Sequence, residues 1–301
     1  MVKVRVPAST SNLACGFDAI GLALQLFLTV EMAFSEDTLQ IESSGEGQEE
    51  IPKDERNLVY KSALSVFQAA GKHLPSLTIR INNAIPLSRG LGSSGAAVIA
   101  GMVCANQLVG AELSNDDILS TAARLEGHPD NVSASLLGGL TISCVSSAGV
   151  VSRRIPLADE RLKAVLLIPD LIISTEAARK VLPTTVPHRD AVFNLQRSAL
   201  LTYAFLTGDY DVLKRAMQDK LHQPYRMPLI PAFEQFKKVA LDNGALGVAI
   251  SGSGSTILAL TVDSGANLEA QWQALASQRH VQAKTTTLAI SNQGAILVEL
   301  L

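Results

Sequence analysis

The amino-acid sequence predicts an α+β fold organised as two domains. Strand patterns and helix patterns cluster along the 301 residues, without the steady strand–helix alternation of a doubly wound sheet. This length accommodates two domains of ordinary size. A turn-rich break, SSAGV, lies within residues 145–160 and predicts the boundary between them. We therefore expect one domain over residues 1–150 and a second over 151–301.

The first half opens with a strand pattern at residues 2–6, where apolar and basic residues alternate. Ser114 followed by Asp116 and Asp117 is typical of a helix N-terminus. A polar, acidic stretch at 42–56 predicts a surface loop. The other patterns of this half predict strands at 26–34, 77–83 and 140–144, and helices at 58–71, 95–109, 114–125 and 129–138.

The second half begins with a strand pattern at 162–168 (LKAVLLI). Two further strands, at 246–250 and 256–262, are separated by the glycine-serine turn SGSGS. C-terminal strands are expected after residue 278. The helical patterns of this half cover 174–182, 187–206, 209–219, 231–242 and 265–278.

Composition and charge exclude several classes of protein. Lys plus Arg is 25 and Asp plus Glu is 28, so the net charge of −3 argues against a nucleic-acid partner. The uncharged stretch 90–111 contains polar residues and glycines, and its continuous apolar part is about half of a membrane span. We expect a buried helix there, no membrane partner and no signal peptide. The scattered cysteines, Cys15, Cys104 and Cys144, indicate reduced thiols and a cytoplasmic protein.

The most informative segment is PLSRGLGSSGAA at residues 86–97, between a predicted strand and a predicted helix. This position directs unpaired backbone N–H groups and the positive end of a helix dipole at one point, which favours phosphate oxygens. The glycines match the dinucleotide fingerprint by letter, but a helix follows where a second strand is required. The Lys and Ser/Thr of a Walker loop are absent. A second glycine-serine turn lies at 252–255.

Taken together, these segments resemble the GHMP kinase family. The family's motifs occur in the family's order at residues 7–21 (PASTSNLACGFDAIG), 86–97 and 247–256 (GVAISGSGST). Within the family the chain is similar to the homoserine kinases, through residues 7–18, 126–132 (EGHPDNV), 174–183 (STEAARKVLP) and 222–226 (HQPYR). The resemblance implies an N-terminal domain of the ribosomal-protein-S5 type, a ferredoxin-like C-terminal domain, and ATP between them.

The resemblance also implies an activity and a set of site residues. The activity is ATP-dependent phosphorylation of the side-chain hydroxyl of L-homoserine, giving O-phospho-L-homoserine for threonine biosynthesis. The residues implied to bind ATP are Pro86, Leu87, Ser88, Arg89, Gly90, Leu91, Gly92, Ser93, Ser94, Gly95, Ala96, Gly252, Ser253 and Gly254. Ser94 and Glu126 are implied to hold Mg²⁺, which takes hard oxygen ligands.

Homoserine carries a carboxylate, an ammonium and a hydroxyl, and the matched motifs supply a group for each. The residues implied to bind it are Arg179 and Arg226 for the carboxylate, Asp18 for the ammonium, and Asn12, His128 and Asn131 near the hydroxyl. Arginine suits a carboxylate because its planar fork donates two parallel hydrogen bonds. Asp130 is the candidate general base by its position in the motif, and Arg179 is the other candidate catalytic residue.

Two alternative functions remain open at this stage. One is a GHMP kinase that acts on another small hydroxy acid, such as threonine or shikimate. The other is a GHMP homologue that binds nucleotide and ligand as a sensor without turnover, although the intact glycines, serines and Glu126 favour an enzyme. The resemblance further implies a homodimer.

Overall fold

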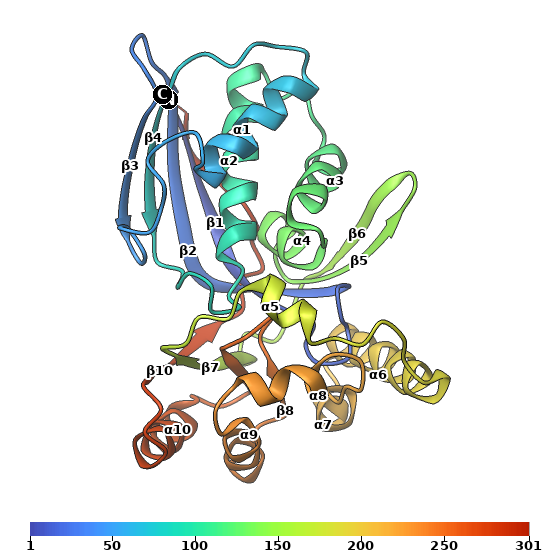
Figure 1. Cartoon of the computed structure of the whole chain (residues 1–301). Helices are drawn as coiled ribbons and strands as arrows, with labels where there is room; N and C mark the ends of the chain where they lie inside the picture. Colours follow the sequence, from blue (N-terminus) through green and yellow to red (C-terminus); the bar gives the residue numbers. More distant parts are fainter. Residues whose placement is uncertain (301) are drawn as a thin grey trace.

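The computed structural model describes residues 1–300, which form two β-sheets with helices packed against them (Figure 1). The first sheet has the strand order β11-β1-β2-β4-β3, and β5 joins it by pairing with β2 and β6. Only the β3–β4 pair is parallel among these described pairings. The strands are β1 Val2–Ser11, β2 Ile20–Phe34, β3 Gln40–Gly45, β4 Leu77–Asn83, β5 Leu140–Ser146, β6 Gly149–Ile155 and β11 Ile296–Leu300.

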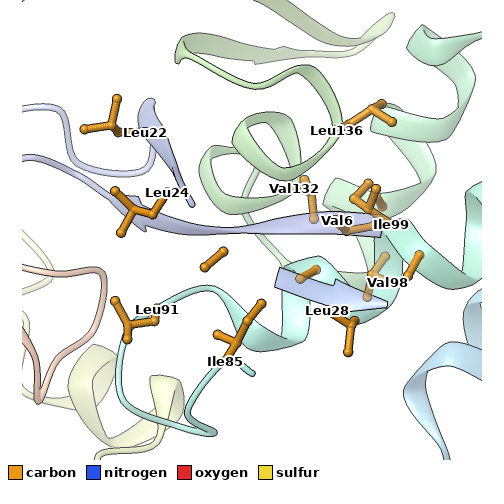
Figure 2. Close-up of a cluster of buried hydrophobic side chains, with 14 of the residues drawn as sticks. Val6, Leu22, Leu24, Leu28, Ile85, Leu91, Val98, Ile99, Val132 and Leu136 are labelled. Atoms are coloured by element: carbon orange, nitrogen blue, oxygen red, sulfur yellow. The ribbon is translucent and has the colours of Figure 1, made fainter. Parts of the chain in front are cut away.

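Helices α1 to α4 cover one face of this sheet (Figure 1). Their bounds are α1 Leu58–Ala69, α2 Ser93–Val109, α3 Asn115–Glu126 and α4 Asp130–Leu137. The central helix α2 touches β1, β2 and the other three helices, which explains why its sequence is apolar on nearly every side. Figure 2 shows Val98 and Ile99 of α2 packed with Val6 of β1 and Val132 of α4.

The second sheet is antiparallel, with the order β10-β7-β9-β8, and its own core is centred on the fully buried Trp272 and Phe236. Phe236 belongs to α9 and Trp272 to α10, and Trp272 Nε1 donates a hydrogen bond to the Phe236 carbonyl at 2.9 Å. The elements of this half are β7 Lys163–Pro169, α5 Thr175–Lys180, α6 His188–Thr207, η1 Tyr210–Val212, α7 Leu213–Ala216, α8 Gln223–Arg226, η2 Met227–Leu229, α9 Phe233–Asp242, β8 Gly247–Ile250, β9 Ile257–Thr261, α10 Ala266–Gln278 and β10 Ala283–Ala289.

The α+β class is confirmed, and the sheets divide the chain at a different place from the expected boundary. SSAGV is the turn of the β5–β6 hairpin, in which Ser146 lies opposite Gly149. The chain therefore stays in the first sheet until Ile155 and enters the second at Lys163. Strand β11 then returns to pair with β1. These pairings support a boundary between Ile155 and Lys163, with the last strand belonging to the first sheet.

Two local predictions were wrong. The polar stretch at 42–56 does not begin as a loop, because its first residues complete β3; only Ile41 of that edge strand is buried, so no alternating pattern marks it. The helix expected at 209–219 is instead the short pair η1 and α7. The chain turns after α7 because the buried Asp219 carboxylate accepts hydrogen bonds from the backbone N–H groups of 221–223. Within residues 1–300, no helix has both the length and the apolar character needed to cross a membrane.

Helices α1 and α2 cross at Gly101, where their backbones come close together. A Cβ atom added at Gly101 would lie 2.4 Å from the Val59 carbonyl oxygen, well inside contact distance. Leu58 and Val59, at the start of α1, also line the large cleft described below. The glycine thus sets how closely α1 packs and where one wall of that cleft stands.

We predict that Gly101→Ala destabilises the protein although alanine is the better helix former. The intrinsic helix propensity favours alanine over glycine by about 1 kcal/mol. The added methyl group must displace the backbone of α1, and overpacking of this kind costs roughly 1–3 kcal/mol or more. Urea denaturation measures the free energy of unfolding. A variant as stable as the parent chain, or more stable, would show that α1 moves aside without cost.

Candidate active site

A cleft of about 390 Å³ lies where the two sheets and their helices meet. Its walls come from segments that are far apart in the sequence: 11–18, 50–59, 87–97, 128–131, 173–179, Arg226 and 252–253. All three motif regions of the sequence therefore contribute to one cavity. The glycine-serine loop and the charged residues Asp18, Arg179 and Arg226 belong to this lining, and Leu28, Ile51, Leu58 and Ile81 supply apolar surface.

The glycine-serine loop presents the N-terminus of α2 to this cleft. Gly92 is the N-cap, with φ 68°, a left-handed conformation that glycine adopts without strain. A Cβ there would lie 2.0 Å from Ser9 Oγ, so a side chain is excluded by contact as well. No side chain in the described part of the protein caps this helix, which leaves its first N–H groups for a ligand. Ile85 and Leu91, buried in the core of Figure 2, hold the loop at both ends.

Most residues predicted to bind ATP line the cleft, and some do not. Leu87, Ser88, Gly90, Leu91, Gly92, Ser93, Ser94, Gly252 and Ser253 line it. Pro86, Arg89, Gly95, Ala96 and Gly254 lie behind this surface. Gly95 and Ala96 belong to the buried side of α2, where Ala96 N–H already binds the Gly92 carbonyl.

Arg89 is directed away from the cleft and connects the loop to the second sheet. Its Nε donates to the Pro169 carbonyl at 3.0 Å and its Nη2 to Asp170 Oδ1 at 2.7 Å, just after the end of β7. Its Nη1 binds the Leu87 carbonyl within the loop itself, at 3.2 Å. The Arg89 carbonyl accepts from Thr256 N–H. Arg89 therefore stabilises the position of the loop from behind.

Ser94 and Glu126 form the pair expected at the metal site. Ser94 Oγ, in the first turn of α2, donates to Glu126 Oε2 at 2.8 Å, at the end of α3. Burial raises the pKa of Glu126, and the hydrogen bond from Ser94 opposes that shift only in part. A desolvated carboxylate beside an uncapped helix N-terminus is suited to a cation, which would relieve this desolvation. Ser94 lines the cleft and Glu126 stands directly behind it.

Five side chains form a connected polar network, and four of them line the cleft. His128 Nδ1 is 2.7 Å from Asp130 Oδ1, and this oxygen also accepts from the backbone N–H of Asn131 at 2.7 Å. The Asn131 amide donates to Ser11 Oγ and accepts from Ser9 Oγ, which ties α4 to β1. Burial by itself lowers the pKa of His128, but the Asp130 hydrogen bond and nearby negative charges outweigh it and raise that pKa overall. Asp130 is almost fully buried.

Asp18 and Arg179, assigned to opposite ends of a ligand, are paired with each other in the structure. Arg179 Nη1 and Nη2 bind the two Asp18 oxygens at 3.0 and 2.8 Å, a parallel double hydrogen bond. Both side chains remain about one-third exposed, so solvent weakens this ion pair. Asn12 supports the same loop, since its Oδ1 accepts from Asp18 N–H and its Nδ2 donates to the Gly252 carbonyl.

Arg226 also lines the cleft, shares the Phe17 ring with Arg179, and is nearly completely buried. Its Nε donates to the Ala178 carbonyl and its Nη1 to the Gly252 carbonyl, both at 3.1 Å. Burial and the neighbouring Arg179 lower the pKa of Arg226. Two guanidinium groups and one carboxylate thus lie near one another in the cleft wall, an excess of positive charge that an anionic group would offset.

The structure also brings in residues that sequence reasoning missed. Ser11, Asn57, Asn83, Ser174 and Thr175 line the cleft alongside the predicted set. Asn57 directly precedes the helix predicted from residue 58, the position of an ordinary helix cap. It does cap α1, because its Oδ1 accepts hydrogen bonds from the Val59 and Tyr60 N–H groups. Ser174 was inside a matched motif and caps α5. Side chains that already have a local structural role carry no separate signal of a ligand.

Comparison with known proteins agrees with this geometry. Residues 57–139 match the family model of the GHMP kinase N-terminal domain, and residues 201–278 match that of the GHMP kinase C-terminal domain. The homoserine kinase of Desulfitobacterium hafniense is 42% identical over 99% of this chain and 100% of its own length. The homoserine kinase of Moorella thermoacetica is 40% identical over 99% of this chain and 100% of its own. The chain belongs to the homoserine kinases of the GHMP kinase family.

Solved structures extend the agreement to the fold. A crystal structure of homoserine kinase from Cytophaga hutchinsonii superimposes with a TM-score of 0.88 and 31% identity, over 99% of this chain and 97% of that one. Mevalonate kinase of L. major has a TM-score of 0.68 at 15% identity, over 95% and 94%, and shares the fold alone. The two-domain GHMP kinase fold predicted from the sequence is confirmed, and the protein is a phosphotransferase that uses ATP as co-substrate.

We predict that Asp170→Asn raises the KM for ATP although Asp170 does not touch the cleft. The substitution removes the charge that holds Arg89 and so loosens the glycine-serine loop. A part-exposed ion pair is worth about 1 kcal/mol at most, which corresponds to roughly a two- to fivefold rise. Steady-state kinetics measure the KM for ATP.

Glu176→Gln, which breaks an exposed ion pair with Lys180 on α5, is the matched control and should leave the KM for ATP unchanged. A KM for ATP that stays at or below that of the parent chain in Asp170→Asn would exclude support of the loop through Arg89.

Proposed function

We propose that this protein transfers the γ-phosphoryl group of ATP to the side-chain hydroxyl of L-homoserine. The product, O-phospho-L-homoserine, would feed threonine synthesis. The observation that carries the proposal is that Asp18, Arg179 and Arg226 line the same cleft as the uncapped N-terminus of α2, which is suited to phosphate. The names of the similar proteins point to the same substrate.

The charges of Asp18, Arg179 and Arg226 complement an amino acid. A zwitterion can replace the Asp18–Arg179 contact with two new ones, the ammonium on Asp18 and the carboxylate on Arg179 and Arg226. Breaking the Asp18–Arg179 ion pair costs little free energy, because both side chains are part-exposed. Arg226 has one terminal nitrogen, Nη2, that makes no hydrogen bond within the described chain, and it can serve the carboxylate.

ATP fits the remaining part of the cleft. Its phosphates would bind the unpaired N–H groups at the start of α2, and its base would lie against the apolar lining formed by Leu28, Leu58 and Ile81. Ser94 and Glu126 are the residues suited to hold Mg²⁺, which takes few protein oxygens and completes its coordination with phosphate and water. When bound, the ion would neutralise charge on the transferring phosphoryl group.

The hydroxyl end of homoserine would lie beside His128 and Asn131, between the charged residues and the phosphate loop. Asp130 Oδ1 already accepts hydrogen bonds from His128 and Asn131. This arrangement favours Asp130 as the residue that orients these two side chains, in place of direct proton abstraction. Phosphoryl transfer depends mainly on positioning and on charge stabilisation, so oriented polar groups can supply most of the catalysis.

The direct test is ADP release with a panel of acceptors. Homoserine, threonine, shikimate and mevalonate are compared at equal concentrations with saturating ATP and Mg²⁺. We expect homoserine to give the highest kcat/KM. A higher value for one of the others would move the substrate assignment within the family, and no ADP release with any acceptor would favour the sensor alternative.

Asp18 provides a prediction about the amino group. Asp18→Asn keeps the size of the side chain and removes one charge-assisted hydrogen bond, worth about 1.5–3 kcal/mol. We therefore expect the KM for homoserine to rise roughly ten- to a hundredfold, with the KM for ATP little changed. Asp116→Asn, on the exposed first turn of α3, is the control and should match the parent chain.

An acceptor without the amino group sharpens this test. 4-Hydroxybutyrate, which lacks only that group, should be a poor acceptor for the parent chain and should lose much of its disadvantage in Asp18→Asn. Equal activity of the parent chain on homoserine and 4-hydroxybutyrate would rule out the contact between Asp18 and the ammonium.

A further inference from the structure

We infer that His222 is a positioning residue that couples the carboxylate-binding Arg226 to the loop that carries Asp18, and thereby sets the spacing at which the site accepts an ammonium and a carboxylate. The inference deepens the proposed function and rests on it. His222 is fully buried and does not line the cleft, so it acts only through the residues that it holds.

The loop at residues 12–18 has an unusual backbone. Asn12, Leu13, Ala14 and Asp18 have φ values of 70°, 42°, 66° and 55°, in a region that costs free energy for residues with a side chain. Such a conformation persists only where the surrounding structure compensates for it. Here the carbonyl of Ala14 accepts a hydrogen bond from His222 Nε2 at 2.7 Å, and that of Cys15 accepts from Ser198 Oγ at 2.8 Å. The second half of the chain therefore stabilises this loop.

The contacts of His222 determine its protonation state. Arg226 can only donate, so the 3.3 Å contact between its Nη1 and His222 Nδ1 requires Nδ1 to be the acceptor. The proton is then on Nε2, which donates to the Ala14 carbonyl, a group that can only accept. His222 is thus neutral and uses both ring nitrogens, and burial lowers its pKa in agreement with this. Asp219 Oδ2, at 3.7 Å from Nε2, is too distant for a hydrogen bond.

Phe17 strengthens the connection between the two charged groups. Its ring stacks on His222 with centroids 4.9 Å apart, and the guanidinium carbon of Arg226 lies 5.1 Å from the same centroid. Phe17 directly precedes Asp18 in the sequence. Two routes, one through the Ala14 carbonyl and one through Phe17, therefore join His222 to the Asp18 loop.

A fixed spacing favours one class of acceptor. Homoserine, as an α-amino acid, carries its ammonium and carboxylate on the same carbon, and a rigid link between Asp18 and Arg226 fits that short separation. An acceptor with only one of the two charges uses only one end of the link. Such truncated acceptors therefore report on each end separately: 4-hydroxybutyrate on Arg226, and 3-aminopropan-1-ol on Asp18.

Two substitutions separate the two hydrogen bonds of His222. His222→Gln places an amide N–H close to the position of Nε2, so it keeps the bond to the Ala14 carbonyl and loses the acceptor for Arg226. His222→Asn places an amide oxygen close to the position of Nδ1, so it keeps the acceptor for Arg226 and loses the bond to Ala14. Tyr225→Phe, on the exposed side of the same short helix, is the matched control. Thermal denaturation establishes that each variant is folded.

We expect both variants to raise the KM for homoserine roughly tenfold, the effect of losing about one hydrogen bond, with the KM for ATP unchanged. The decisive readout is the crossed pattern with truncated acceptors. His222→Gln should lower kcat/KM for 4-hydroxybutyrate and spare 3-aminopropan-1-ol, whereas His222→Asn should do the reverse. A general structural role would lower both in the same proportion in both variants, and that result would overturn the inference, as would an unchanged KM for homoserine.

The test distinguishes this inference from the proposed function. A parent chain that releases ADP with homoserine, combined with variants that show no crossed pattern, overturns the role of His222 alone. A parent chain that does not phosphorylate homoserine overturns both. Should one variant fail to fold, the other still decides the matter, since each one has its own expected loss on one truncated acceptor.

Discussion

The organisation of the cleft depends on one constraint, the close approach of backbone to backbone where the glycine-serine loop passes between the two halves of the molecule. A Cβ at Gly90 would lie 2.1 Å from the Ser251 carbonyl oxygen, and one at Gly92 would lie 2.0 Å from Ser9 Oγ. With no side chains in the way, Ser251 Oγ reaches the Gly90 carbonyl at 2.6 Å, and Ser9 N–H reaches the Leu91 carbonyl at 3.1 Å. The loop is thus held by both sheets.

Mutual hydrogen bonding explains why so many buried polar side chains are tolerated around the cleft. Asn131, Ser9 and Ser11 satisfy one another, and Asp219 accepts hydrogen bonds from three backbone N–H groups and the Asn194 amide. Buried polar groups of this kind destabilise a protein only when they lack partners. In the described part of the chain, Thr256 Oγ1 is the buried side-chain atom that lacks a partner, and it lies outside the cleft. At the cleft itself, the groups with hydrogen-bonding capacity to spare are on the first turn of α2 and on Arg226. The polar network therefore stabilises the fold and leaves unpaired polar groups facing the cleft.

The charged residues follow the same division between support and recognition. Arg89 and Arg226 are both largely buried. Arg89 donates hydrogen bonds to the Pro169 and Leu87 carbonyls and to Asp170. In Arg226, one terminal nitrogen beside the cleft makes no hydrogen bond within the described chain. Arg179 is intermediate, since both of its terminal nitrogens donate to Asp18, a partner that is itself part-exposed at the cleft. Residue type alone does not separate these roles. The geometry of the neighbours does, because a guanidinium nitrogen that already donates within the protein is less available to a ligand.

The sequence by itself was sufficient for the fold class, for most helices and strands, and for the motif segments that meet at the cleft. These follow from local patterns: the apolar faces of α1 and β4, the cap at Ser114, and the glycines that α2 requires at its start. Family resemblance added roles for Asp18, Arg179 and Arg226. The edge strand β3, the hairpin at residues 146–149 and the return of β11 to the first sheet were not predictable, because each depends on a partner strand.

Only the tertiary structure decided how the site residues relate to one another. It paired Asp18 with Arg179, turned Arg89 away from the cleft, engaged Asp130 with His128, and placed His222 between Ala14 and Arg226. The contact of Asp130 with His128 is local in the sequence. His222 and Arg226 are also close in the sequence, but His222 is itself held by the distant Ala14 carbonyl. The other contacts join residues that lie far apart in the sequence. A local pattern records which side chains are available and on which face of an element they lie. The hydrogen-bond partners that give each side chain its role are set by the packing of the two sheets, which no local segment encodes by itself.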